Sequence, residues 1–203
     1  MTEKKLTRSE QKRQAILDAA HKAFKEYGVQ GTSMDQLAAL AEVSKRTVYN
    51  HFESKEALVM HLIREMWQKA IQGSDVEFSA EGSLEEQLTQ LLMAEIEVIT
   101  TQEYIDLARV AMGHFFYHPE ALKQEIERMS EQESALKRWL NSAIESGKLK
   151  PVDMEFAINQ LHGMIKGSFF WPQLLQIAPL PDQKEKEHLV QETAAMFLSY
   201  YQK

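Results

Sequence analysis

The apolar residues of this chain recur at the helical period along almost its whole length, and no stretch alternates between apolar and polar residues as a strand does. The first apolar stripe runs through Ile16, Ala20, Phe24 and Tyr27 and is followed by Gly28. A glycine at this place predicts the end of a helix, because the left-handed conformation beyond a helix C-terminus suits only glycine well. Together the stripes predict an all-α fold of about nine helices.

Residues suited to cap helices stand where these stripes begin. Thr7 and Glu10 have the spacing of a capping box before the first helix. The second helix has two candidate N-caps, Thr32 and Ser33, because each is followed three residues later by a suitable partner. Ser44 is placed to cap a third, short helix.

The rest of the chain also reads as helices separated by a few breaks. The polar stretch 72–83 is the clearest loop. A stripe that follows Pro119 predicts one helix as far as Gly147, and Pro172 is expected to kink or end the helix before it. We expect two domains, residues 1–54 and residues 55–203.

Composition restricts the class of protein. The 203 residues are 44% hydrophobic and include no Cys, which excludes disulfides and thiolate metal sites. The N-terminus lacks the apolar segment of a secretory signal, and no run approaches the roughly 20 apolar residues of a membrane span. A cytoplasmic protein with no membrane partner is therefore expected. Residues 1–56 carry ten Lys and Arg against eight Asp and Glu, whereas the whole chain has a net charge of −7.

Two short predicted helices, about residues 33–41 and 45–51, have the dimensions of a helix-turn-helix. Ala38 and Ala41 are small enough to let the two helices cross closely, and Val48 is expected to face inward. Lys and Arg can neutralise phosphates or donate to guanine, and Asn can pair with adenine. Such helix pairs also occur in all-helical proteins that do not bind DNA, and cations also suit any exposed turn. The outward residues of the second helix are Lys45, Arg46, Thr47, Tyr49 and Asn50.

The run "ILDAAHKAFKEYGVQGTSMDQLAALAEVSKRTVYNHFESKEALV", Ile16 to Val59, resembles the DNA-binding region of the TetR family of transcriptional regulators. The runs "LARVAMGHFFYHPEAL" and "LHGMIKGSFFWPQLL" are similar to family members with an AefR-type C-terminal domain. The resemblance implies a three-helix DNA-binding domain at the N-terminus and a helical-bundle domain for ligand binding and dimerisation. The matching elements are Ala20, Phe24, Gly28, Gly31-Thr32, Ala38, Val43-Ser44, Thr47, Tyr49, His51-Phe52, Lys55 and Leu58.

The resemblance implies roles for individual residues of the helix-turn-helix. Lys45 and Asn50 are expected to read base edges, and Tyr49, His51 and Lys55 to contact phosphates. All the DNA contacts expected are Thr32, Ser33, Ser44, Lys45, Arg46, Thr47, Tyr49, Asn50, His51 and Lys55.

Two residues depart from the family pattern. Glu42 stands in the turn where members commonly have Gly, so a left-handed conformation is expected at a residue with a side chain. Arg46 stands where many members have Gly, and is expected to add a contact that changes the preferred DNA sequence.

In the body of the chain, the resemblance implies a ligand pocket and a dimer contact on the last two long helices. For both sets the pattern also fits residues that only fill the chain's own core. The pocket is expected among Met93, Met112, Phe115, Phe116, Trp139, His162, Met164, Phe169 and Trp171. The dimer contact is expected among Ile158, Leu161, Ile165, Leu189, Thr193, Met196, Phe197 and Tyr200.

No pattern predicts catalysis, a cofactor or a metal. His114 and His118 are four residues apart, but Pro119 disfavours helical geometry at His118 and no third ligand is near in sequence. Glu95 and Glu97 lie on different faces of a helix and do not form a carboxylate pair.

The expected function is a homodimeric repressor that binds a palindromic operator in double-stranded DNA and is released by a small, apolar effector. The alternatives are a helical-bundle enzyme, and an interaction module or activator that acts through a protein partner.

Overall fold

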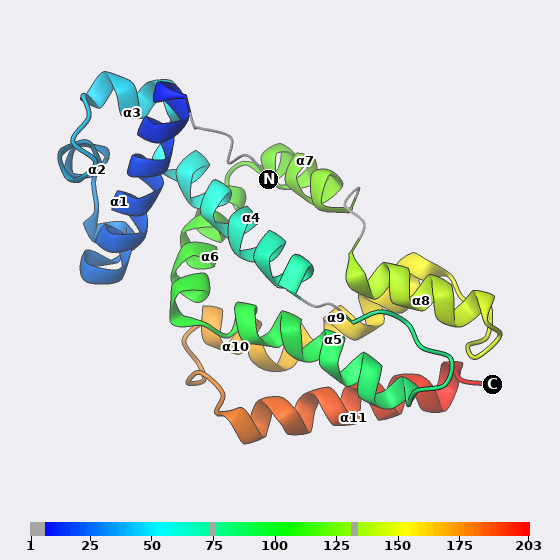
Figure 1. The fold of residues 1–203 in the computed structure, drawn as a ribbon. Coiled ribbons are helices and arrows are strands. Elements are labelled where there is room, and N and C mark those ends of the chain that lie inside the picture. Colours follow the sequence, from blue (N-terminus) through cyan, green and yellow to red (C-terminus); the bar gives the residue numbers. More distant parts are fainter. Residues whose placement is uncertain (1–6, 74–75, 131–133) are drawn as a thin grey trace. The chain divides into compact units, whose positions relative to one another are not determined.

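The computed structural model describes residues 7–73, 76–130 and 134–203. Eleven helices and no strand lie within these residues, which confirms the all-α class (Figure 1). The predicted helix from Pro119 to Gly147 is two helices, α7 (Pro119–Ser130) and α8 (Ala135–Glu145). Ser134 starts α8, because its side chain accepts a hydrogen bond from the backbone N–H of Lys137. Apolar periodicity alone did not reveal this break.

The described residues divide into two compact units. The first unit contains the residues up to Glu65 together with Asp106–His118. The second contains Met66–Ile105 and Pro119–Lys203. Two helices, α4 (Lys55–Gly73) and α6 (Gln102–Phe115), contribute residues to both units. The domain limits expected from the sequence, 1–54 and 55–203, do not coincide with these units. The division into a DNA-binding and a ligand-binding domain at these limits stays a prediction.

The first helix, α1 (Arg8–Gly31), begins with the predicted capping box between Thr7 and Glu10. Gly28 interrupts α1 with φ 73° and ψ 160°, and helical geometry resumes before Gly31. Gly28 therefore has the positive φ that was predicted, but the helix bends at this residue and continues beyond it. Ile16 and Ala20 are fully buried, so the predicted apolar stripe of α1 does face a core.

Arg13 of α1 contacts His61 of α4 within the first unit. The guanidinium nitrogens of Arg13 lie 3.1 and 3.2 Å from the two ring nitrogens of His61, and the same group lies 4.9 Å from the centroid of the Phe52 ring. Burial lowers the pKa of His61, and the charge of Arg13 lowers it further. A neutral imidazole can accept a hydrogen bond from the guanidinium, so this contact joins α1 to α4 while His61 is uncharged.

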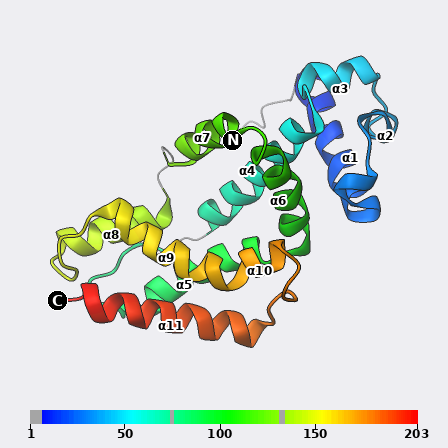
Figure 2. The ribbon, with the colours of Figure 1, turned by 180° about the vertical axis from the view of Figure 1, so that it is seen from behind.

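The second unit is built around α5 (Leu84–Ile99). The last helix, α11 (Gln183–Tyr201), packs along α5 and also touches α9 (Met154–Phe169) (Figure 2). α9 ends at Phe169, and Trp171–Leu174 forms the short helix α10 with Pro172 in its first turn. The expectation that Pro172 would kink or end the helix before it is thus met. Among the described residues, no helix is both long and apolar enough to cross a membrane.

Gln87 joins three segments of the second unit. Its side-chain oxygen accepts hydrogen bonds from the backbone N–H of Ser79 at 2.8 Å and from Nε1 of Trp139 at 3.0 Å. Its amide donates to the backbone oxygens of Ser79 and Ser83. Because the amide is fully satisfied, a polar residue can be buried here and hold Trp139 of α8 against α5.

Gly28→Ala should lower the free energy of unfolding by about 1–3 kcal/mol, because its φ and ψ fall in a region that only glycine occupies without strain. An added Cβ meets no atom within 4 Å, so the loss would come from backbone strain alone. Urea denaturation measures the change. Gly31→Ala is the matched control: its Cβ would meet only Tyr27 Cβ at 3.8 Å, so stability should stay the same or rise. Equal losses in the two variants would contradict the assignment of strain to Gly28.

Candidate nucleic-acid interface

Two seven-residue helices, α2 (Met34–Leu40) and α3 (Lys45–His51), form the predicted helix-turn-helix. The cap of α2 is Ser33: its hydroxyl accepts from the N–H of Gln36, whose side chain accepts from the N–H of Ser33. Ser44 caps α3, as predicted, by accepting from the N–H of Thr47 at 3.1 Å. These local hydrogen bonds determine where each helix begins.

The turn between the helices contains Glu42, the residue that replaces the glycine common in the family and was expected to be strained. Glu42 has φ 52°, which confirms a left-handed residue with a side chain in the place of the common glycine. The turn is closed by a hydrogen bond of 3.0 Å from the N–H of Val43 to the oxygen of Ala38. Ala38 and Ala41 are buried, which agrees with the need for small residues where the helices cross.

α3 has one buried side chain and an outward surface of polar residues. Val48 is fully buried, and Phe52 at the end of the helix is 4% exposed. Thr47 and His51 are partly exposed at the edges of this surface. The exposed residues of the cap and helix are Ser44, Lys45, Arg46, Tyr49 and Asn50.

Lys45 is paired with a carboxylate of α2, a contact that the sequence did not predict. Its Nζ lies 2.8 and 3.0 Å from the two carboxylate oxygens of Asp35 in the first turn of α2. The hydrogen bond to Asp35 holds the pKa of Lys45 above its ordinary value. Both side chains are more than half exposed, so the pair is weak and can exchange for a phosphate or a base edge.

Two of the predicted DNA contacts serve the fold in this structure. The hydroxyl of Thr32 is buried and donates to the backbone oxygen of Gly28 at 2.8 Å, so this side chain does not reach the surface. The Nζ of Lys55 donates to the backbone oxygens of Val29 at 3.1 Å and Thr32 at 3.2 Å. Lys55 thereby joins the start of α4 to the end of α1, and it keeps one ammonium proton for another acceptor.

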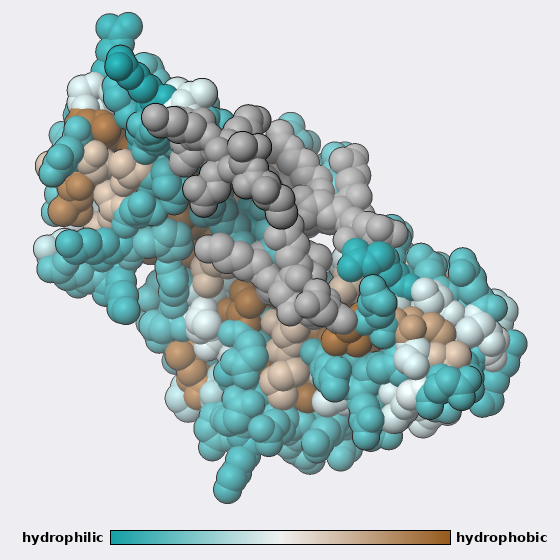
Figure 3. Space-filling view, viewed as in Figure 1, coloured by the Kyte–Doolittle hydropathy of each residue, from teal (hydrophilic) through white to brown (hydrophobic). Residues whose placement is uncertain are grey.

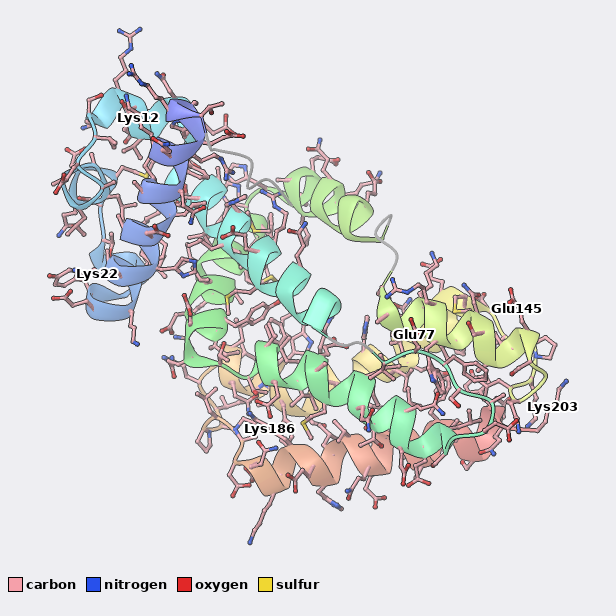
Figure 4. The ribbon with its side chains drawn as sticks, in the orientation of Figure 1. Lys12, Lys22, Glu77, Glu145, Lys186 and Lys203 are labelled. Carbon is pink, nitrogen blue, oxygen red and sulfur yellow. The ribbon has the colours of Figure 1, made fainter. Side chains whose placement is uncertain are left out.

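Further cations lie on α1. Lys12 and Lys22 are exposed, and their side chains project from this helix (Figure 4). The surface of the α1–α3 region is largely hydrophilic with separate hydrophobic patches (Figure 3). Leu40 and Tyr27 are among its exposed hydrophobic residues.

The predicted pocket residues differ widely in exposure. Phe116 is 78% exposed and Trp171 is also exposed, so neither lines an interior pocket in this structure. Trp139 is buried, but its Nε1 is already bonded to Gln87. Met112, Phe115 and Phe116 belong to the first unit, and the other six predicted residues belong to the second. His162 lies beside Glu95, and its Nε2 is 3.2 Å from a carboxylate oxygen.

Half of the residues predicted for the dimer contact lie in the core of the second unit. Leu161, Ile165, Thr193 and Phe197 are each at most 3% exposed, because the apolar stripes of α9 and α11 face the body's own helices. Ile158 and Leu189 are partly exposed. Met196 and Tyr200 are exposed and stay available to a partner.

His114 and His118 stack with their ring centroids 4.4 Å apart. Within the ranges that the structure describes, no group of three or more His, Asp or Glu is arranged to hold a metal ion.

Lys55→Met should lower the free energy of unfolding by about 1–3 kcal/mol, because two backbone oxygens would lose a charged donor. Lys45→Met is the matched control and should leave stability nearly unchanged, since its partner Asp35 is exposed. Urea denaturation of both variants separates a lysine that supports the fold from one that is free to bind. Similar stability of the two variants would argue against the structural role of Lys55.

Comparisons with known proteins agree with this arrangement. Residues 16–62 match the family model for bacterial regulatory proteins of the tetR family, and residues 86–203 match the model for the C-terminal domain of AefR-like transcriptional repressors. The chain is 28% identical over 194 residues to the uncharacterized HTH-type transcriptional regulator YhgD of Bacillus subtilis, with 94% of each chain covered.

Solved structures show the same similarity. A TetR family regulator from Pseudomonas syringae is 38% identical with a TM-score of 0.72, over 97% of this chain and 98% of that one. A putative TetR-family regulator from Mesorhizobium loti is 26% identical with a TM-score of 0.74, over 98% and 100% of the two chains. This chain therefore belongs to the TetR family of DNA-binding transcriptional regulators.

Proposed function

We propose that this TetR-family regulator is a cytoplasmic repressor that binds a palindromic operator as a homodimer and is released by a small, apolar effector. The observation that supports DNA reading most directly is the surface of α3. Val48 points into the core, and Lys45, Arg46, Tyr49 and Asn50 point away from it. These are the residue types that contact phosphates and base edges in a major groove. Repression is favoured over activation because the matched C-terminal family is described as one of repressors.

A second copy of the chain is needed because a seven-residue reading helix contacts too few bases to select one site. A two-fold dimer places two such helices in successive major grooves, about 34–36 Å apart. We expect the dimer contact on the exposed sides of α9 and α11. A 2.6 Å hydrogen bond from the hydroxyl of Tyr201 to Gln160 shows that these helices lie side by side.

The exposed side of α9 is unusual for a chain in which 26% of residues are charged. From Phe156 to Trp171, Lys166 is the one Lys, Arg, Asp or Glu, and it is only partly exposed. Phe156 is 58% exposed, and Met196 on α11 is 61% exposed. Depletion of charge together with exposed aromatic and Met side chains is characteristic of the centre of a protein interface. The exposed positions between Phe156 and Trp171 are all uncharged: Asn159, Gln160, Gly163, Gly167 and Ser168.

The effector is expected to act through the helices that belong to both units. α4 begins beside the helix-turn-helix, where Lys55 holds the end of α1, and it continues into the second unit. A ligand that binds the body more tightly in one position of α4 than in another would shift the separation of the two reading helices. The shift can be no larger than this difference in affinity allows.

Binding to a labelled duplex from the region upstream of its own gene, followed by fluorescence anisotropy, tests the DNA-binding proposal. The logarithm of the affinity should fall linearly with the logarithm of salt concentration, by about 0.9 for each phosphate neutralised. Asn50→Ala should reduce the preference for the operator over a scrambled duplex by about 5- to 150-fold, as expected for the loss of a bidentate base contact.

Tyr49→Phe should weaken binding to both duplexes equally, because it removes a phosphate contact. Tyr27→Phe, a change at another exposed tyrosine of the first unit, is the control and should leave binding unchanged. A protein that binds no duplex even at low salt would favour the alternative of an interaction module. Increased transcription on binding would favour an activator.

Met196→Glu should convert the dimer into monomers by placing a charge in the centre of the proposed contact. Sedimentation velocity measures the change. Tyr117→Glu is the control, because Tyr117 is also exposed but lies outside α9 and α11. A Met196→Glu protein that stays dimeric would place the dimer contact elsewhere.

A further inference from the structure

A carboxylate interrupts the stripe of leucine and isoleucine that α5 buries, as the amide of Gln87 does near the start of the helix. The buried stripe runs through Leu88, Leu92, Glu95 and Ile99, and Glu95 is only 9% exposed. By contrast, the side chain of Glu97 is 46% exposed and forms an ion pair at 3.0 Å with Lys186. Lys186 lies at the start of α11 (Figure 4). Replacing a buried ionic group with a hydrophobic residue is often neutral or stabilising, so stability alone does not account for Glu95.

The two carboxylate oxygens of Glu95 have different surroundings. Oε2 lies 3.2 Å from Nε2 of His162. Oε1 is 3.9 Å from Nζ of Lys166, which is too far for a hydrogen bond. Among the described residues Oε1 has no hydrogen-bond donor although it is buried. A buried acceptor without a donor costs free energy, so a hydrogen bond from a donor on another molecule would be favourable at this oxygen.

The carboxylate is ionised at neutral pH. Burial raises the pKa of Glu95, but the hydrogen bond from His162, followed by the electrostatic attraction of His162 and Lys166, outweighs burial and holds the pKa below its ordinary value. The oxygen that lacks a donor therefore belongs to an anion, which accepts stronger hydrogen bonds than a neutral group does.

The two groups of α9 beside this carboxylate are partly exposed. His162 and Lys166 are one turn apart on α9, and the side chain of each is 31% exposed. The carboxylate itself is buried, so these neighbours on α9 are the part of the site that solvent reaches.

We propose that Glu95 Oε1 is the polar anchor of the effector site and accepts a hydrogen bond from a hydroxyl or N–H group of an uncharged, otherwise apolar molecule. This inference rests on the proposed ligand-responsive function and names the chemistry of its ligand. His162 and Lys166 position the carboxylate and stand beside the bound group.

The charges around the site favour a neutral ligand. Lys166 balances the charge of Glu95 when His162 is neutral, and a cationic ligand would then add an uncompensated positive charge beside the ammonium group. An anionic ligand would bring a second negative charge next to Glu95. A hydroxyl or N–H group supplies the missing donor and adds no charge.

Three compounds with the same apolar body test this chemistry: 4-butylphenol, its methyl ether 4-butylanisole, and 4-butylbenzoate. Binding to the full-length protein without DNA is measured by isothermal titration calorimetry and by the shift in melting temperature. The phenol should bind at least about fivefold more tightly than the ether, which lacks the donor, and than the anion. Glu95→Leu should remove this preference, and melting shows directly whether that variant is folded.

Glu95→Gln provides a second, nearly isosteric variant, and the preference for the phenol should fall at least about fivefold in it too. Glu97→Gln is the matched control, because it changes an exposed carboxylate two positions away, and it should retain the preference. Equal binding of phenol and ether, a preference that survives both Glu95 variants, or no binding by any of the compounds would overturn the proposed anchor.

Release of operator DNA by 4-butylphenol is measured separately. If the phenol binds through Glu95 but does not release DNA, the anchor is supported and the proposed effector response is wrong. If the protein binds its operator but does not distinguish the phenol from the ether, the DNA-binding function stands and the anchor is wrong.

Discussion

The burial of Val48 is the contact on which the DNA-reading surface depends. α3 has only seven residues, and isolated helices shorter than about 12–15 residues are marginal in water. The helix therefore holds its place through its Ser44 cap and through packing against α1 and α2. Because each helical residue is rotated by about 100° from the one before it, an inward Val48 directs Arg46 and Asn50 to the opposite side of the helix, and Lys45 and Tyr49 are exposed beside them. One buried side chain thus decides which residues DNA can contact.

The helix ends around α3 are held by side chains that act on the backbone. Ser33 and Ser44 satisfy backbone N–H groups at the starts of α2 and α3, and Lys55 donates to two backbone oxygens at the end of α1. Lys55 shows that a lysine beside a DNA-reading helix can support the fold first and still offer a proton to a phosphate. The body uses the opposite arrangement at Glu95, where one buried oxygen is left without a donor. The backbone groups around α2 and α3 thus have side-chain partners, and α5 contains a buried oxygen to which a ligand can donate a hydrogen bond.

Local rules predicted much of the fold and of the site. The capping box at Thr7, the caps at Ser33 and Ser44, and the positive φ of Gly28 and Glu42 all depend on a few neighbouring residues, and all are present. The sequence did not reveal that Asp35 pairs with Lys45 or that Lys55 bonds to the end of α1. Those partners are ten and more residues away, and no local pattern specifies a contact over that distance.

The sequence by itself determined the helical class and most helix starts, because hydrophobic period and capping chemistry are local properties of the chain. The resemblance of the run from Ile16 to Val59 to the TetR family indicated the family. Only the tertiary structure decided what each apolar stripe packs against. Leu161, Ile165, Thr193 and Phe197 fit a dimer contact and an internal core equally well by periodicity, and packing assigned them to the core. It also buried Glu95 beside His162, because which residues of α5 and α9 meet depends on how two helices distant in sequence cross.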